Sequence, residues 1–206
     1  MKILRIRAQG LPLYQQTFDL TFFAAQRVDA AHEGQVTNLF HNICVNNAEA
    51  FVGLNASGKT SALNVVAFTF MLLNAMSLNN ESVPKVLSAD QPAIFDIDFY
   101  AAGTVYHLKS KIAITQVDGF TKVTIGSETL WKKSATTKVN KSNLFDWDGI
   151  EPYRMREDAG EYLPDDVSIT IALIKQLKRG FNVISRVGLT NYNFFLPRER
   201  TVLPEI

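Results

Sequence analysis

The residues best suited to chemistry lie between positions 53 and 60, where the chain reads Gly-Leu-Asn-Ala-Ser-Gly-Lys-Thr. A glycine, four further residues and then Gly-Lys-Thr have the spacing of a phosphate-binding loop. The glycines allow a tight turn that brings backbone N–H groups onto phosphate oxygens. A helix that begins where the loop ends also favours an anion through its dipole. The pattern therefore predicts nucleotide binding.

The positions of this loop have distinct predicted roles. Lys59 is the candidate catalytic residue, because its ammonium group can reach the β- and γ-phosphates. Thr60 offers a hydroxyl group to Mg²⁺, which makes it the candidate metal ligand. The other nucleotide-binding candidates are Gly53, Asn55, Ala56, Ser57, Gly58 and Ser61.

Two elements must position the loop. Residues 48–52 are mostly apolar and predict a short strand that leads into Gly53. Residues 58–78 predict one helix, and its apolar side chains occur on nearly every face, so we expect it to be buried on most faces. A strand, a glycine-rich loop and a helix in this order are the context in which the motif binds phosphate.

A magnesium-orienting acidic residue would complete such a site, and it usually ends an apolar strand. The nearest candidates are Asp96 and Asp146, but the apolar runs before them are short. Asp96 also lies in an alternating segment, which favours an aspartate on a solvated face. Asp165 and Asp166 follow Pro164 and are interpreted as caps of a helix over residues 167–179.

The rest of the chain indicates strands and turns. Alternation of polar and apolar residues predicts strands within the first fifty positions and again from 94 to 137, with turns at 102–103 and 118–119. The second region therefore predicts an antiparallel meander of three or four strands. We expect three parts: a nucleotide-binding lobe (1–92), the meander packed on the same lobe (93–137), and an irregular connection with a helical segment (138–206).

Composition and charge exclude several classes of protein. The formal net charge of +1 gives no global electrostatic case for binding nucleic acid. A single cysteine, Cys44, rules out an internal disulfide framework, and with His41 it forms only half of a zinc-binding pattern. The most apolar stretch, at 65–73, is too short to span a bilayer. We expect a globular protein of the cytoplasm.

The chain resembles the N-terminal half of the bacterial AAA-family (ABC/SMC-like) ATPases, a group that includes OLD-like and RecF-like proteins. The resemblance rests on the Gly-x-Asn-x-Ser-Gly-Lys-Thr loop about fifty residues into the chain, the apolar helix after it, and the pattern of residues 95–108 and 128–133. It implies an α/β fold: a P-loop NTPase of the ABC/SMC-head type, with a mixed sheet around a phosphate-loop helix and an antiparallel β meander.

The resemblance also implies ligands and partners. ATP would lie on residues 53–60 with Mg²⁺ at Thr60, and hydrolysis would occur between two heads, in a homodimer or with a head-to-head partner. DNA is a further partner by family analogy, and a membrane is not. Residues 10–14 replace the Asn-Phe-Arg-Ser turn of many members, and the magnesium-site glutamine is unassigned among Gln91, Gln116 and Gln176.

The family's signature segment, acidic strand and switch histidine would belong to a C-terminal half that these 206 residues do not contain. We therefore expect the isolated chain to bind ATP without efficient turnover. Two alternatives stay open. One is a complete P-loop kinase of a small molecule, although fifty residues of predicted strand precede the loop. The other is a non-catalytic, nucleotide-dependent interaction module.

Overall fold

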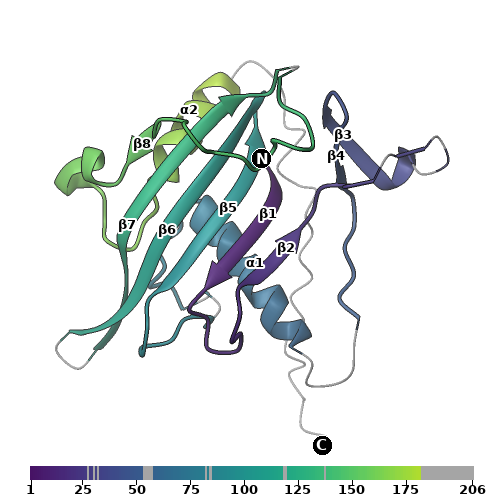
Figure 1. Cartoon of the computed structure of the whole chain (residues 1–206). Helices are drawn as coiled ribbons and strands as arrows, with labels where there is room; N and C mark the ends of the chain where they lie inside the picture. Colours follow the sequence, from purple (N-terminus) through teal and green to yellow (C-terminus); the bar gives the residue numbers. More distant parts are fainter. Residues whose placement is uncertain are drawn as a thin grey trace, which may run out of the picture.

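In the computed structural model, the described residues form eight strands, two α-helices and two 3-10 helices (Figure 1). The described residues are 1–26, 28–29, 31, 33–52, 58–81, 83, 85–117, 120–136 and 138–181. The strands are β1 (Lys2–Gln9), β2 (Phe18–Thr21), β3 (Val36–Phe40), β4 (Ile43–Asn46), β5 (Ala93–Ala101), β6 (Thr104–Val117), β7 (Phe120–Ser134) and β8 (Arg154–Met155). The helices are α1 (Lys59–Leu73), α2 (Thr170–Phe181) and the 3-10 helices η1 (Glu33–Gln35) and η2 (Glu157–Tyr162).

One sheet organises the fold. It has six strands in the order β2-β1-β5-β6-β7-β8, and β3 and β4 pair as a separate two-stranded hairpin. Every strand pairing in the described parts of the chain is antiparallel. A tight turn at Ala102 and Gly103, both with positive φ, joins β5 to β6 and sets their register. Such short connections can join only antiparallel neighbours.

The main core lies between the sheet and the helices, which both lie behind the sheet in Figure 1. The ring of Phe68 on α1 lies 5.1 Å from that of Phe95 on β5, and both side chains are fully buried. The hydroxyl of Thr170, the first residue of α2, donates to the carbonyl of Leu72 near the end of α1. This contact and the shared core hold α2 beside α1.

A buried carboxylate fastens the chain before α2 to the sheet. Glu128 on β7 accepts hydrogen bonds from the hydroxyls of Ser110 and Ser168 and from the backbone N–H of Ile169. Its second oxygen forms an ion pair with Arg156 at 3.1 Å. The Glu128 side chain is fully buried, so these partners replace the water that it would otherwise bind.

The opposite face of the sheet, called here the outer face, carries a smaller core. Residues 138–150, called here the strap, cross this face and pack Val139 and Leu144 against Leu4 and Val105. The β3–β4 hairpin adds Ile43 and Val45 to the same cluster. The strap therefore joins the hairpin to the sheet.

The predicted fold class is wrong. The chain is mostly an antiparallel sheet with two short helices, and not a mixed α/β P-loop NTPase built around a phosphate-loop helix. Strands of parallel sheets are apolar on both faces, whereas β5 alternates Phe95 and Ile97 on the helix side with Asp96 and Asp98 on the other. The alternation that predicted the meander therefore belongs to an antiparallel sheet with two different faces.

Three predicted elements also differ from the structure. Residues 48–52 are not a strand. Helix α1 was predicted to continue to about residue 78, but it ends at Leu73. The backbone N–H groups of Asn74 and Ala75 close its last turn. Helix α2 begins at Thr170, three residues later than predicted. Asp166 does not cap it but accepts a hydrogen bond from Asn79 at 3.0 Å.

Candidate functional site

The predicted nucleotide-binding residues fall in two groups. Gly53, Asn55, Ala56 and Ser57 lie outside the described residues. The other four are consecutive at the start of α1: Gly58 is the N-cap, and Lys59, Thr60 and Ser61 begin the first turn.

The start of α1 has the backbone geometry of an anion-binding helix end. Gly58 has φ 84° and ψ 10°, a left-handed conformation that glycine adopts without a steric cost. Among the described residues no side chain caps this end, and the first turn of the helix contains no acidic residue. The first N–H groups of a helix have no partner within the helix, and the helix dipole is positive there. This end therefore favours a negatively charged ligand.

Tyr14 connects the turn after β1 to this helix end. Its hydroxyl donates to the carbonyl of Gly58 at 3.5 Å, and its ring packs edge-on against Phe18. Burial raises the pKa of Tyr14, so the hydroxyl remains a donor at neutral pH. The turn after β1 therefore places a tyrosine side chain against the start of α1.

The two acidic candidates are not near this helix end. Asp96 lies on the outer face of the sheet, because its neighbours Phe95 and Ile97 pack in the core beside α1. Asp146 belongs to the strap across the same outer face, where its carbonyl accepts a hydrogen bond from Lys133. The structure therefore does not bring either carboxylate to Thr60.

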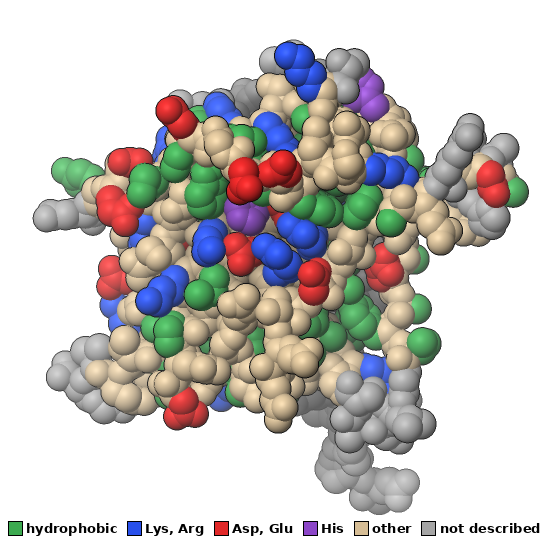
Figure 2. All heavy atoms as spheres, viewed as in Figure 1, with side chains coloured by type: hydrophobic (Ala, Val, Ile, Leu, Met, Phe, Trp, Pro, Cys, Tyr) green, Lys and Arg blue, Asp and Glu red, His purple; other side chains and the backbone are tan. Residues whose placement is uncertain are grey.

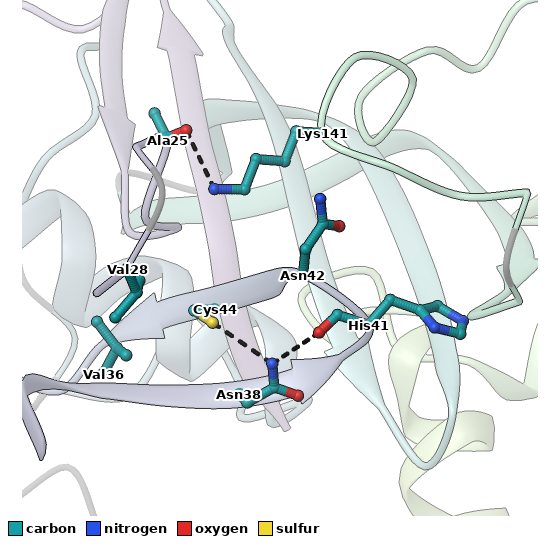
Figure 3. A pocket seen from close by; sticks show the side chains of 8 residues that line it. All are labelled: Ala25, Val28, Val36, Asn38, His41, Asn42, Cys44 and Lys141. Carbon is teal, nitrogen blue, oxygen red and sulfur yellow. Dashed lines mark hydrogen bonds between the residues drawn. The ribbon is translucent and has the colours of Figure 1, made fainter. Parts of the chain in front are cut away.

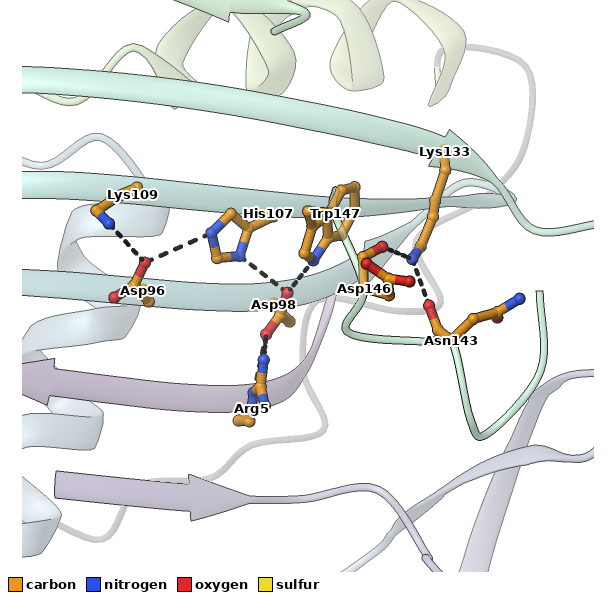
Figure 4. Close-up of polar contacts among 9 residues, drawn as sticks. All are labelled: Arg5, Asp96, Asp98, His107, Lys109, Lys133, Asn143, Asp146 and Trp147. Carbon is orange, nitrogen blue, oxygen red and sulfur yellow. Dashed lines mark hydrogen bonds and ion pairs between the residues drawn. The ribbon is translucent and has the colours of Figure 1, made fainter. Parts of the chain in front are cut away.

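A second group of polar residues lies on the outer face, and the sequence analysis did not identify it. Figure 2 shows acidic and basic side chains mixed at the centre of this face, and Figure 4 shows how they meet. Asp98 and His107 face each other across β5 and β6, with Asp98 fully buried and His107 7% exposed. Arg5 on β1 contacts Oδ2 of Asp98 at 3.0 Å.

Both ring nitrogens of His107 face carboxylates. Nδ1 lies 2.9 Å from Oδ1 of Asp98, and Nε2 lies 3.5 Å from Oδ1 of Asp96. Burial alone would lower the pKa of His107, but the bonds to Asp96 and Asp98 outweigh it and raise the pKa above 6.5. Burial also acts to raise the pKa of Asp96, but His107, Lys109 and Arg7 together lower it. The imidazolium form, which can donate from both nitrogens, fits this arrangement.

The strap covers this group with aromatic rings. The indole of Trp147 stacks on His107 with ring centroids 5.4 Å apart, and its Nε1–H donates to Oδ1 of Asp98 at 2.8 Å. The ring of Phe145 lies 4.0 Å from the guanidinium carbon of Arg5. Lys133 donates hydrogen bonds to the strap carbonyls of Asn143 and Asp146. Burial lowers the pKa of Lys133, although the negative charges of Asp98 and Asp146 act to raise it.

The sequence did contain one signal of this group. A two-residue turn at 102–103 pairs residue 98 with 107 and residue 96 with 109, which places two aspartates opposite a histidine and a lysine. The alternating pattern around Asp96 favours an aspartate on a solvated face. That interpretation is wrong, because Asp96 is only 9% exposed. The covering strap comes from a distant part of the chain that no local pattern connects to β5.

A cavity of about 710 Å³ opens between the hairpin and the strap (Figure 3). Asn38 bridges its wall by donating to the carbonyl of His41 and to the sulfur of Cys44. Lys141 donates to three successive carbonyls, those of Ala24, Ala25 and Gln26. The three protons of this ammonium are thus used in fastening the strap to the chain after β2.

No protein-family model matches the sequence, and no curated protein matches it. In the described part of the chain, no group of three or more His, Cys, Asp and Glu side chains could hold a metal ion. No helix in the described part of the chain is long and apolar enough to cross a membrane.

Proposed function

We propose that the chain binds Mg·ATP through residues 53–60 and acts as the ATP-binding lobe of a larger ATPase. The start of α1 carries the proposal. Gly58, the second glycine of the motif, has a left-handed conformation, and Lys59 and Thr60 follow it in the first turn of the helix. The order of glycine, lysine and a hydroxyl residue at a helix start is the arrangement that phosphate recognition requires.

Each of these residues has a part in binding. The N–H groups of the first turn would receive phosphate oxygens, and the ammonium group of Lys59 would balance the charge of the β- and γ-phosphates. The exposed hydroxyl of Thr60 fits Mg²⁺, which prefers hard oxygen ligands and keeps several waters. When bound, the metal supplies further charge neutralisation.

We also propose that hydrolysis requires groups from a second copy or from another part of an assembly. Asp96 and Asp146 lie on the outer face of the sheet, away from α1, and so neither can orient Mg²⁺ at Thr60. The chain would then bind ATP without efficient turnover. A cytoplasmic location, where Mg·ATP is abundant, is part of the same proposal.

Calorimetric titration with Mg·ATP tests the binding. The unaltered chain should bind, and Lys59→Ala should weaken binding by at least about tenfold through loss of a charge-assisted contact. Lys111→Ala is the matched control, because it removes the same charge from an exposed position on the outer face. Equal binding by the Lys59 variant, or no binding by the unaltered chain, would overturn the proposal.

Phosphate release from the same samples tests the second part. We expect negligible turnover by the isolated chain even when ATP is bound. Robust hydrolysis that Lys59→Ala abolishes would contradict the need for outside groups while leaving the binding proposal intact.

A further inference from the structure

One of the strap's contacts with the sheet is made to a buried histidine. Trp147 stacks on the His107 ring and bonds to Asp98, the same carboxylate oxygen that His107 contacts. Strap and sheet therefore share one acceptor atom. The β3–β4 hairpin depends on the strap in turn, through the cluster that Leu144 forms with Ile43.

The protonation state of His107 determines whether the contacts of its ring with Asp96 and Asp98 are both attractive. With both nitrogens protonated, the ring donates to Asp98 and faces Asp96 with a second N–H. A neutral ring has one N–H and one lone pair. If Nδ1 keeps its proton for Asp98, the lone pair of Nε2 faces the Asp96 carboxylate, and that contact becomes repulsive.

The neighbouring charges cannot replace the imidazolium. They come from every element packed around the ring: Arg5, Arg7, Asp96, Asp98, Lys109, Lys133 and Asp146. Lys109 reaches Asp96 only at 3.8 Å, with a side chain that is 55% exposed. Arg5 is already paired with the far oxygen of Asp98. Loss of the proton also removes the attraction between a cationic ring and the indole face of Trp147.

We propose that His107 is a pH-sensitive latch: its protonated ring holds residues 138–150 on the outer face, and its deprotonation loosens this strap and the β3–β4 hairpin attached to it. The latch is independent of the nucleotide proposal, because it lies on the sheet face opposite to α1. It would let the protein change the exposure of one face without unfolding its main core.

The chain contains its own reporters for this event. It has two tryptophans, and both Trp131 and Trp147 pack against His107, with ring centroids 5.3 Å and 5.4 Å away. A protonated imidazole in contact with an indole quenches its fluorescence. Intrinsic emission should therefore follow the protonation of this one histidine.

The first test is fluorescence of the Trp131→Phe variant between about pH 5 and about pH 9. Emission from Trp147 should rise in one step with a midpoint above 6.5, the ordinary value from which the pKa of His107 is raised. His107→Gln should abolish the step, which also separates it from the amino terminus of Met1, whose pKa burial lowers. Asp96→Asn should move the midpoint down, because one of the two carboxylates that favour the imidazolium is lost.

Amide hydrogen exchange supplies the second test. After correction for intrinsic rates, residues 138–150 and 36–46 should exchange faster above the midpoint than below it, while the amides of α1 and β5 remain protected. The absence of a fluorescence step, or a step that persists in His107→Gln, would overturn the proposal. Exchange of the strap that does not change across the midpoint would also overturn it. Should His107→Gln fail to fold, an unmoved midpoint in Asp96→Asn counts against the latch.

Discussion

The indole of Trp147 donates a hydrogen bond to Oδ1 of Asp98 at 2.8 Å, across 49 positions of the chain. The same oxygen contacts Nδ1 of His107, and the other oxygen accepts from Arg5. A fully buried carboxylate thus joins three elements: the first strand, the β5–β6 hairpin and the strap. Each partner satisfies a group that would otherwise be buried without water.

Replacement of Asp98 should destabilise the fold strongly. Asp98→Asn removes the charge that balances Arg5 and His107, and loss of one partner from a buried ion pair typically costs about 3–5 kcal/mol. The free energy of unfolding from urea denaturation measures this cost. The control is Asp19→Asn at an exposed site on β2, which should change stability by no more than about 0.5 kcal/mol.

Stability should depend on pH through His107. Its pKa is raised in the folded protein, so the stability that it adds is fully present below 6.5 and is lost as pH rises through the folded pKa. The free energy of unfolding of the unaltered chain should therefore exceed that of His107→Gln by more at about pH 6 than at about pH 9. A difference of equal size at both values would contradict this expectation.

Glu128 should matter more as an acceptor than as a charge. Burial raises its pKa, opposing the hydrogen bonds that favour the carboxylate. Glu128→Gln keeps one acceptor oxygen and should cost less than Glu128→Ala. We expect Glu128→Ala to cost about 3 kcal/mol or more, because it removes the carboxylate that accepts from two hydroxyls and a backbone N–H and that pairs with Arg156. Chemical denaturation of both variants gives the comparison.

An exposed ion pair is the matched contrast to Glu128. Lys122 contacts Asp165 at 3.0 Å, but the two side chains are 44% and 65% exposed. Asp165→Ala should therefore cost less than about 1 kcal/mol, and added salt should reduce the effect. A loss of stability as large as that of Glu128→Ala would show that burial does not determine how much these two carboxylates contribute to stability.

Two glycines with nearly the same φ should respond differently to alanine. Gly10 has φ +75° and Gly103 has φ +77°, so alanine carries a similar backbone cost of about 1–2 kcal/mol at each. A Cβ at Gly10 would lie 2.4 Å from the carbonyl oxygen of Pro92, whereas a Cβ at Gly103 meets nothing within 4 Å. Thermal unfolding should show a clearly larger loss for Gly10→Ala, since the backbone of Pro92 would have to move.

Local patterns predicted the parts of the fold that depend on neighbouring residues. The alternation and turns of residues 94–137 predicted antiparallel strands, and β5, β6 and β7 pair in that way. The motif also predicted a helix from residue 58, and α1 begins at Lys59. Periodicity and turn chemistry act over a few residues, which makes them readable in a sequence.

The wrong predictions concern relations between distant segments. The family resemblance implied a mixed sheet, but the pairing of β1 with β5 is antiparallel and joins residues about ninety positions apart. The apolar residues 48–52 predicted a strand, yet they form no pairing in the structure. A strand exists only where another backbone supplies hydrogen bonds, and composition does not say which backbone that is.

The sequence by itself determined the order of glycine, lysine and threonine at the start of α1, the turn at 102–103 and the alternation of β5, because each depends on backbone preferences over a few residues. Only the tertiary structure decided that Asp98 meets Arg5 across 93 positions and that Trp147 covers His107. Those contacts depend on sheet register and on the path of the strap. Burial then changed two aspartates and a histidine from ordinary surface groups into a linked, charged cluster.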